Sequence, residues 1–128
     1  MEYSLFQYAY LGDAIYEVYV RRYLLSKNIV KLKDLQRESL NFVTARRQAY
    51  FVKCLEEGFL SDLEMDIIRK GRNLKTNSKP KSCDVITYRY ATALEVLFGY
   101  YFIVGETDRL EEIFNEIIKL WGSYVSIW

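Results

Sequence analysis

The spacing of apolar residues is the feature that most restricts how this chain of 128 residues can fold. Apolar side chains recur at steps of three and four residues along almost the whole sequence, and no sustained run alternates between apolar and polar residues. The first pattern is typical of helices with one buried side, whereas alternation would indicate a half-buried strand. The sequence therefore predicts an all-α fold, and its length predicts a single domain over residues 1–128.

Capping residues and helix breakers divide this pattern into segments. The first segment is either one long helix or two helices that meet near Gly12. Gly122 is expected to end the last helix. Residues 71–84 contain a glycine, the only proline and several small polar residues, so they are expected to form a loop. The predicted helices cover residues 4–26, 32–42, 44–57 (capped by Thr44), 61–70 (opened by a capping box), Asp84 or Thr87 to Val104, and 107–121.

The chain contains no histidine, which narrows the chemistry available to it. Ser-His-Asp and Cys-His nucleophilic systems are excluded, as are zinc sites built on histidine. Any catalysis should therefore depend on carboxylates or on a metal. No apolar stretch reaches the roughly 18 residues of a spanning helix, and residues 1–20 lack a signal peptide pattern, so we expect a soluble, cytoplasmic protein with no membrane partner.

A single charged side chain, Glu95, interrupts the apolar stretch ATALEVLFGYYFIV at residues 91–104. On a helix it shares a face with small or aromatic side chains that suit close helix packing, namely Tyr88, Ala91, Thr92, Gly99 and Phe102. Burial of a carboxylate there is costly unless it is protonated, paired with a cation or bound to a metal. The sequence leaves open an ion pair to an arginine of another helix and a metal site.

Asp13, in the stretch QYAYLGDAIY at residues 7–16, raises the same question. It continues an apolar stripe towards the start of the first helix, although an aspartate directly after a glycine is also a common N-terminal cap. Glu17, one turn further on, is either an additional ligand or an exposed helical glutamate. Taken together, Asp13 and Glu95 predict a site for a hard divalent cation held by oxygen ligands, which suits Mg²⁺ best.

Positive charge is concentrated between residues 69 and 89. This region holds seven basic residues and one acidic residue, a net charge of +6, while the rest of the chain holds eleven basic and sixteen acidic residues, a net charge of −5. Such a region favours polyanion binding, because neutralised phosphates release counterions, and a solvated basic loop is the alternative. The residues expected to bind nucleic acid are Arg69, Lys70, Arg72, Lys75, Lys79, Lys81 and Arg89.

Carboxylates that hold Mg²⁺ beside a phosphate-binding region suit phosphodiester hydrolysis, which needs no histidine. Two motifs point to a family with this activity. AYLGDAIYE resembles the ribonuclease III signature around its catalytic aspartate, and YRYATALEVLFGYYF resembles the second acidic helix of that family, with similar spacing from about Leu5 to Leu120. KGRNLKTNSKPKSCDVITYRYATALE narrows the resemblance to the short Mini-III branch, which has the nuclease domain without a double-stranded-RNA-binding domain.

The resemblance implies the helical bundle of a ribonuclease III endonuclease domain, assembled as a homodimer. It implies Mg²⁺-dependent cleavage of both strands of an RNA duplex, leaving 5′-phosphate and 3′-hydroxyl ends, in the maturation of 23S ribosomal RNA. Asp13 matches the catalytic aspartate and Glu95 the metal-binding glutamate, while Asn73 of the Gly-Arg-Asn turn joins the residues expected to bind RNA. A large-subunit ribosomal protein remains open as a further partner.

Two acids of the full-length enzymes do not carry over, because this chain has Ala9 and Thr92 at their positions, as Mini-III proteins generally do. Waters must then complete the metal shell, and Glu17 or Asp84 could assist. The main alternative is a catalytically silent scaffold that binds double-stranded RNA. Helical Mg²⁺-dependent nucleotide pyrophosphatases are a second alternative, but no Glu-x-x-Glu pair lies on an apolar helix face. The tail, residues 123–128, could cover the core or contact a partner.

Overall fold

A computed structural model describes residues 1–75 and 83–127 of the chain. Within these ranges the chain forms helices and no strands, so the predicted all-α fold is confirmed. None of these helices is long and apolar enough to cross a membrane. The helices are α1 (Leu5–Ser26), α2 (Leu32–Val43), α3 (Ala45–Leu55), α4 (Asp62–Arg72), α5 (Val85–Val104) and α6 (Thr107–Ile127).

Helix α1 is a single helix that passes through Gly12 without a break. It begins after a capping box, in which the Ser4 hydroxyl accepts from the Gln7 N–H at 3.2 Å and the Gln7 side chain accepts from the Ser4 N–H at 2.8 Å. Asp13 therefore lies more than two turns inside the helix. The alternative that Asp13 caps a helix is wrong, because the cap is supplied by Ser4.

Two predicted helix ends were placed too early. Helix α4 includes Gly71 and Arg72, although both were assigned to the loop, and α6 continues through Gly122 to Ile127. A glycine inside a helix costs about 1 kcal/mol relative to alanine, and tertiary contacts can outweigh that cost. The rings of Trp121 and Tyr124 stack with their centroids 5.5 Å apart, and the Arg47 guanidinium of α3 lies 4.8 Å and 4.6 Å from their centres, so packing against α3 holds the last turns of α6.

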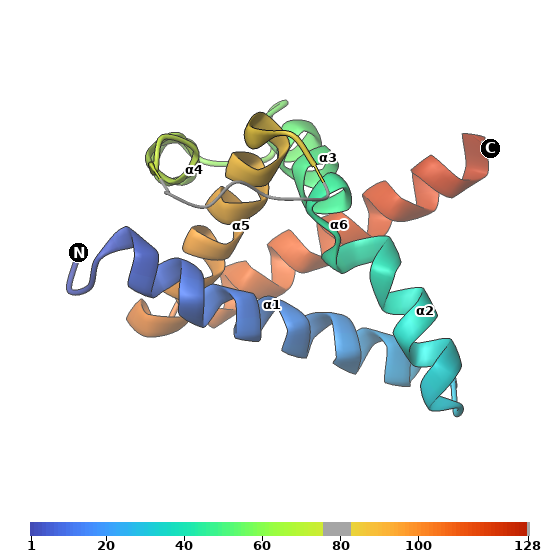
Figure 1. Cartoon of the computed structure of the whole chain (residues 1–128). Coiled ribbons are helices and arrows are strands. Elements are labelled where there is room, and N and C mark those ends of the chain that lie inside the picture. The colour runs from blue at the N-terminus through green and yellow to red at the C-terminus, as the bar shows by residue number, and fades with distance from the viewer. Residues whose placement is uncertain (76–82, 128) are drawn as a thin grey trace.

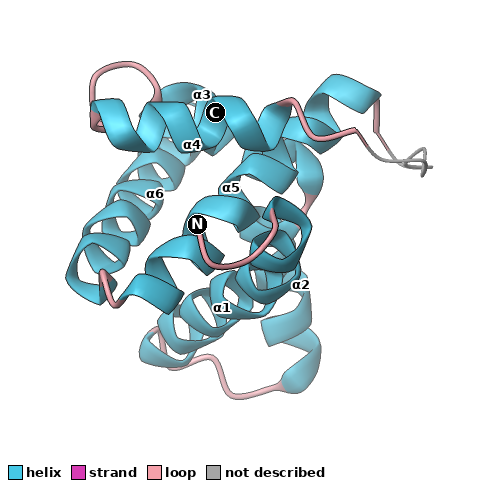
Figure 2. Cartoon of the chain, turned by 90° about the vertical axis from the view of Figure 1, so that its left-hand side faces the viewer, coloured by secondary structure: helices cyan, strands magenta, loops and turns pink. Residues whose placement is uncertain are grey.

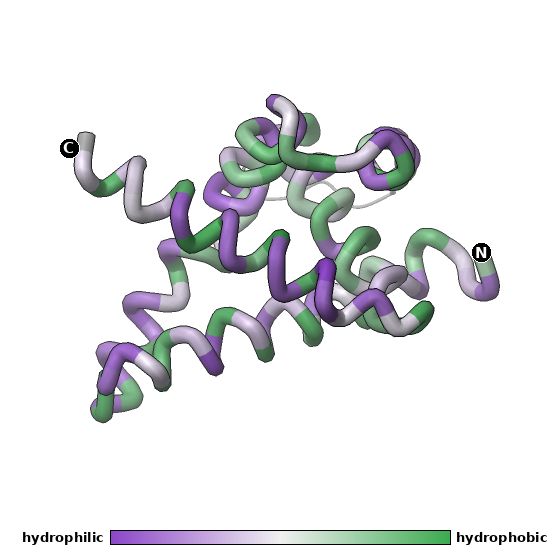
Figure 3. Tube along the Cα trace, turned by 180° about the vertical axis from the view of Figure 1, so that it is seen from behind, coloured by the Kyte–Doolittle hydropathy of each residue, from purple (hydrophilic) through white to green (hydrophobic). Residues whose placement is uncertain are grey.

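Helix α5 lies at the centre of the fold and packs most extensively against α1, then against α4 and α3 (Figures 1 and 2). Its N-cap is Asp84, whose carboxylate accepts from the Thr87 N–H at 2.7 Å, and it ends at Gly105 in the left-handed conformation. Because neighbours cover it on several sides, it is apolar around most of its circumference. Helix α6 has one apolar side, and Figure 3 shows hydrophilic and hydrophobic residues alternating along it.

The backbones of α1 and α5 touch where the helices cross. A Cβ atom added to Gly12 would lie 1.6 Å from the Glu95 carbonyl oxygen, and one added to Gly99 would lie 2.0 Å from the Tyr8 carbonyl oxygen. Both contacts are far shorter than any packed side chain allows. The two glycines therefore serve the close approach of the helices.

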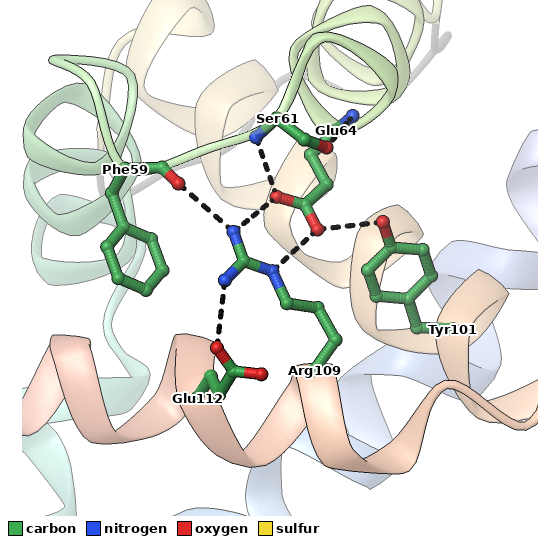
Figure 4. Close-up of polar contacts among 6 residues, drawn as sticks. All are labelled: Phe59, Ser61, Glu64, Tyr101, Arg109 and Glu112. Atoms are coloured by element: carbon green, nitrogen blue, oxygen red, sulfur yellow. Dashed lines mark hydrogen bonds and ion pairs between the residues drawn. The ribbon is translucent and has the colours of Figure 1, made fainter.

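A buried ion pair joins the start of α4 to α5 and α6 (Figure 4). Glu64, only 2% exposed, accepts hydrogen bonds at 2.8 Å from both Nε and Nη2 of Arg109, and a third at 2.8 Å from the Tyr101 hydroxyl. Burial by itself would raise the pKa of Glu64, but the hydrogen bonds from Arg109, the Ser61 backbone and Tyr101 outweigh it and lower the pKa from 4.5 to about 2.

We expect Gly12→Ala to destabilise the protein by more than about 3 kcal/mol, because the new methyl group would overlap the Glu95 backbone. Gly122→Ala is the matched control. A Cβ at Gly122 meets nothing within 4 Å, so this variant should gain up to about 1 kcal/mol of helix propensity. Urea unfolding of both variants measures the effect, and equal midpoints for Gly12→Ala and the wild type would contradict the close crossing.

We expect Glu64→Gln to lose about 3–5 kcal/mol of stability at neutral pH, since it removes the buried carboxylate that pairs with Arg109 and leaves only the exposed Glu112 as an acidic partner. The pKa of Glu64 is lower in the folded chain than in the unfolded one, so its stabilising effect is complete above about pH 4.5 and disappears as the pH falls towards 2. Unfolding measured from pH 7 to pH 2 should therefore show wild type and variant converging in acid. A constant difference across this range would contradict the assignment.

Candidate active site

Asp13 and Glu95 meet at the crossing of α1 and α5. Gly12 touches the backbone of Glu95, so the next residue of α1, Asp13, lies beside the glutamate. Asp13 is exposed and Glu95 is half-buried, so the two carboxyl groups lie at the rim of the helix contact, where solvent can reach them. The structure thus brings together the two acids that the sequence singled out from separate helices.

The two carboxyl groups interact with each other without a nearby cation. Burial first, then the negative charge of Asp13 and a hydrogen bond between the two side chains, raise the pKa of Glu95 from 4.5 to about 8. Within the described ranges, neither acid forms an ion pair with a lysine or arginine. The predicted alternative of an arginine partner for Glu95 is therefore not observed.

The two acids that could have assisted, Glu17 and Asp84, already have structural roles. Glu17 pairs with Arg21 one turn further along α1, with 3.2 Å between its Oε2 and the arginine Nε. Asp84 caps α5, and the hydrogen bonds from Thr87 lower its pKa. In the part of the chain that the structure describes, no three acidic or cysteine side chains gather into a metal-binding cluster. Asp13 and Glu95 are thus a pair.

Small side chains occupy the two positions at which the resemblance of the motifs suggested further acids. Ala9 is partly buried and packs against the hydrophobic core. Thr92 is buried, and its hydroxyl donates to the Tyr88 carbonyl oxygen at 3.0 Å on its own helix. Neither side chain adds a negative charge to the site.

The basic residues fall into two groups according to their partners. Arg69 and Lys70 both pair with Asp66 on α4, so part of their charge is neutralised. Arg72 has no acidic partner among the described residues and instead donates from Nη1 to the Tyr90 hydroxyl at 2.8 Å. The remaining predicted residues are Asn73, which caps the end of α4, Lys75, which is exposed, Arg89, which is half-buried, and Lys79 and Lys81, which lie outside the described ranges.

One cation beside this group was missed because it lies far away in the sequence. Lys53, on α3, places its Nζ atom 5.1 Å from the centre of the Tyr90 ring. The aromatic residues around Arg89 were visible in the sequence, but no spacing rule connects Lys53 to them. Only the packing of α3 against α5 brings the two together.

Comparisons with known proteins agree with this geometry. The Ribonuclease III domain matches residues 7–106. The chain belongs to the ribonuclease III family. It is 37% identical to the Mini-ribonuclease 3 of Clostridium tetani over 88% of this chain and 75% of that protein, and 41% identical to the Mini-ribonuclease 3 of a Thermoanaerobacter species over 88% and 78%. A crystal structure of a Fusobacterium nucleatum protein, 31% identical, aligns with a TM-score of 0.81 over 92% of this chain and 93% of that one.

As a member of the ribonuclease III family, the chain is an endoribonuclease, a hydrolase that acts on RNA. The resemblance inferred from its motifs is confirmed. Enzymes of this family depend on a metal ion. Asp13 and Glu95 suit such an ion, because two neighbouring carboxylates with no cationic partner in the described ranges are stabilised by a hard divalent cation.

Proposed function

We propose that this ribonuclease III-family chain cleaves double-stranded RNA with Mg²⁺ at Asp13 and Glu95, leaving 5′-phosphate and 3′-hydroxyl ends. The observation that supports this most is the pairing of the two carboxyl groups at the crossing of α1 and α5, without a lysine or arginine partner in the described residues. A protein that only binds RNA has no need for two neighbouring acids, which would repel the phosphates.

Asp13 of α1 and Glu95 of α5 would supply the oxygen ligands for the metal. Mg²⁺ held by them would supply a water of lowered pKa and neutralise charge that develops on the phosphate oxygens. Glu95 projects from the central helix, whose burial limits its movement, and Asp13 is held beside it by the backbone contact at Gly12. The chain itself thus keeps both oxygen ligands in place before RNA binds.

The basic end of the molecule, where α4 finishes and α5 begins, is suited to hold the RNA backbone. An A-form duplex presents phosphates and 2′-hydroxyls across a shallow minor groove, so a protein can recognise its shape with little reading of bases. Arg72, Lys75 and Arg89 form no ion pair with an acid in the described part of the chain. Together with Lys79 and Lys81 they would make binding strongly dependent on salt.

We also propose that the chain forms a homodimer through the outer side of α1. One row of α1 at four-residue spacing consists of Phe6, Tyr10, Ala14 and Val18. The large apolar side chains in this row are exposed, at 52% for Phe6, 86% for Tyr10 and 56% for Val18. Large apolar side chains gathered on one helix face are typical of a protein interface. Because this row runs beside Asp13, a second copy would bring its own catalytic pair towards the first, as cleavage of two strands requires.

We propose maturation of 23S ribosomal RNA as the cellular function, as the resemblance of the motifs to the Mini-III branch implies. The long stems of ribosomal RNA precursors offer the duplex that this site needs. A large-subunit ribosomal protein that presents such a stem is a fitting partner for the enzyme.

We expect the wild type to cut a long RNA duplex only when Mg²⁺ is present, and to spare single-stranded RNA and nucleoside triphosphates. Asp13→Asn and Glu95→Gln should each lower the cleavage rate at least about 100-fold, because each removes a ligand, while duplex binding is largely kept. The measurements are gel-based cleavage with Mg²⁺ or chelator and binding in chelator.

Glu111→Gln is the control for these variants, because it removes an exposed carboxylate on α6 that pairs with Arg22. It should cleave like the wild type. Binding of duplex without cleavage at any Mg²⁺ concentration would instead establish a silent RNA-binding scaffold. Hydrolysis of nucleoside triphosphates would favour the pyrophosphatase alternative.

We expect Tyr10→Arg to shift the protein from dimer to monomer, because it places a charge in the proposed apolar interface. Sedimentation equilibrium measures the mass directly. Val30→Arg is the control, since Val30 is just as exposed, at 88%, but lies between α1 and α2. If both variants kept the mass of the wild type, the interface would lie elsewhere, and a monomeric wild type would contradict the dimer itself.

A further inference from the structure

Three helices place two cations on one tyrosine ring near the start of α5. Lys53 of α3 lies with its Nζ atom 5.1 Å from the centre of the Tyr90 ring, and Arg72 of α4 lies with its Cζ atom 5.1 Å from the same centre. Arg72 also donates to the Tyr90 hydroxyl at 2.8 Å. Cation–π contacts of this kind hold a charged group in position without neutralising it.

Neither cation has an acidic partner within 4 Å in the ranges that the structure describes. The charge of Lys53 lowers the pKa of Asp84, but by less than the hydrogen bonds from Thr87 do. The Asp84 carboxylate accepts those hydrogen bonds as the N-cap of α5. Arg69 and Lys70, by contrast, share Asp66. Lys53 and Arg72 thus form a positively charged pair that has no ion-pair partner within 4 Å in the described part of the chain.

The position of Tyr90 on α5 separates this pair from the reacting groups. Glu95 follows Tyr90 by five positions, which is about 7.5 Å along the helix axis and about 140° around it. The cations therefore face the α3 and α4 side of α5, whereas Glu95 faces α1. They therefore lie on a different side of α5 from the carboxylate pair.

We propose that Lys53 and Arg72, positioned by Tyr90, bind backbone phosphates of the RNA duplex away from the cleaved bond. Lys53 is then an RNA-binding residue that does not belong to the basic region at residues 69–89, and Tyr90 is a positioning residue. This inference rests on the proposed action on double-stranded RNA. It identifies a contact that contributes to affinity and not to the chemical step.

Lys53→Gln tests the proposal, with Lys27→Gln as a matched control. Lys27 also lies over a tyrosine ring, with its Nζ atom 5.7 Å from the centre of Tyr23, but at the far end of α1. Binding of a long RNA duplex is measured in chelator over a series of salt concentrations. Loss of one phosphate contact should weaken binding about 5-fold at low salt and make the slope of log K against log salt shallower by about 1.

Cleavage kinetics and a second variant separate binding from structure. Lys53→Gln should raise KM while kcat changes little, because the lost contact is made equally before and during the reaction. Tyr90→Phe keeps the ring under Lys53 but removes the acceptor of Arg72, so it should also weaken binding, by less than Lys53→Gln. Thermal melting of each variant within a few degrees of the wild type shows that the fold is retained.

Equal affinity and salt slope for Lys53→Gln, Lys27→Gln and the wild type would overturn this proposal while leaving duplex cleavage in place. A fall in kcat with unchanged KM would also overturn it, because the residue would then act in the chemical step. If the wild type itself neither bound nor cut the duplex, the proposed function would fail first. The two failures are therefore distinguishable in one experiment.

Discussion

The close crossing of α1 and α5 is the contact on which the rest of the structure depends. Gly12 and Gly99 let the two backbones touch, and this contact leaves no room for either helix to slide or rotate against the other. One register therefore results, with Asp13 beside Glu95. The central helix is in turn fixed for its other neighbours, since Gly71 of α4 packs on its opposite side against Ala93.

The buried Glu64 and the half-buried Glu95 show that a glutamate can either stabilise the fold or form part of a candidate metal site. Glu64 is satisfied by Arg109, Tyr101 and the Ser61 backbone, so its charged form is favoured and its pKa falls to about 2. Glu95 faces another carboxyl group, and its pKa rises to about 8. The first arrangement is complete within the chain, whereas the second suits a cation, and enzymes of this family depend on a metal ion.

The structure also divides the basic residues in a way that composition could not. The positive charge at residues 69–89 is partly neutralised by Asp66, which forms ion pairs with Arg69 and Lys70. Arg72 points instead to Tyr90, where Lys53 joins it from another helix. Charge available to a polyanion thus depends on which acids lie within reach, and local sequence shows only some of them.

The sequence by itself determined the helical class and most helix boundaries, and it singled out the two acids of the proposed site, because apolar spacing, caps such as Ser61 and Asp84, and an isolated charge in an apolar helix are local properties. Only the tertiary structure decided that α1 is unbroken, that α6 passes through Gly122, and that Lys53 joins Tyr90. In these cases packing between distant segments outweighs local preference. By local preference alone, a glycine indicates the end of a helix. Within this fold, glycines lie where two helices touch or where stacked aromatic rings hold a helix together.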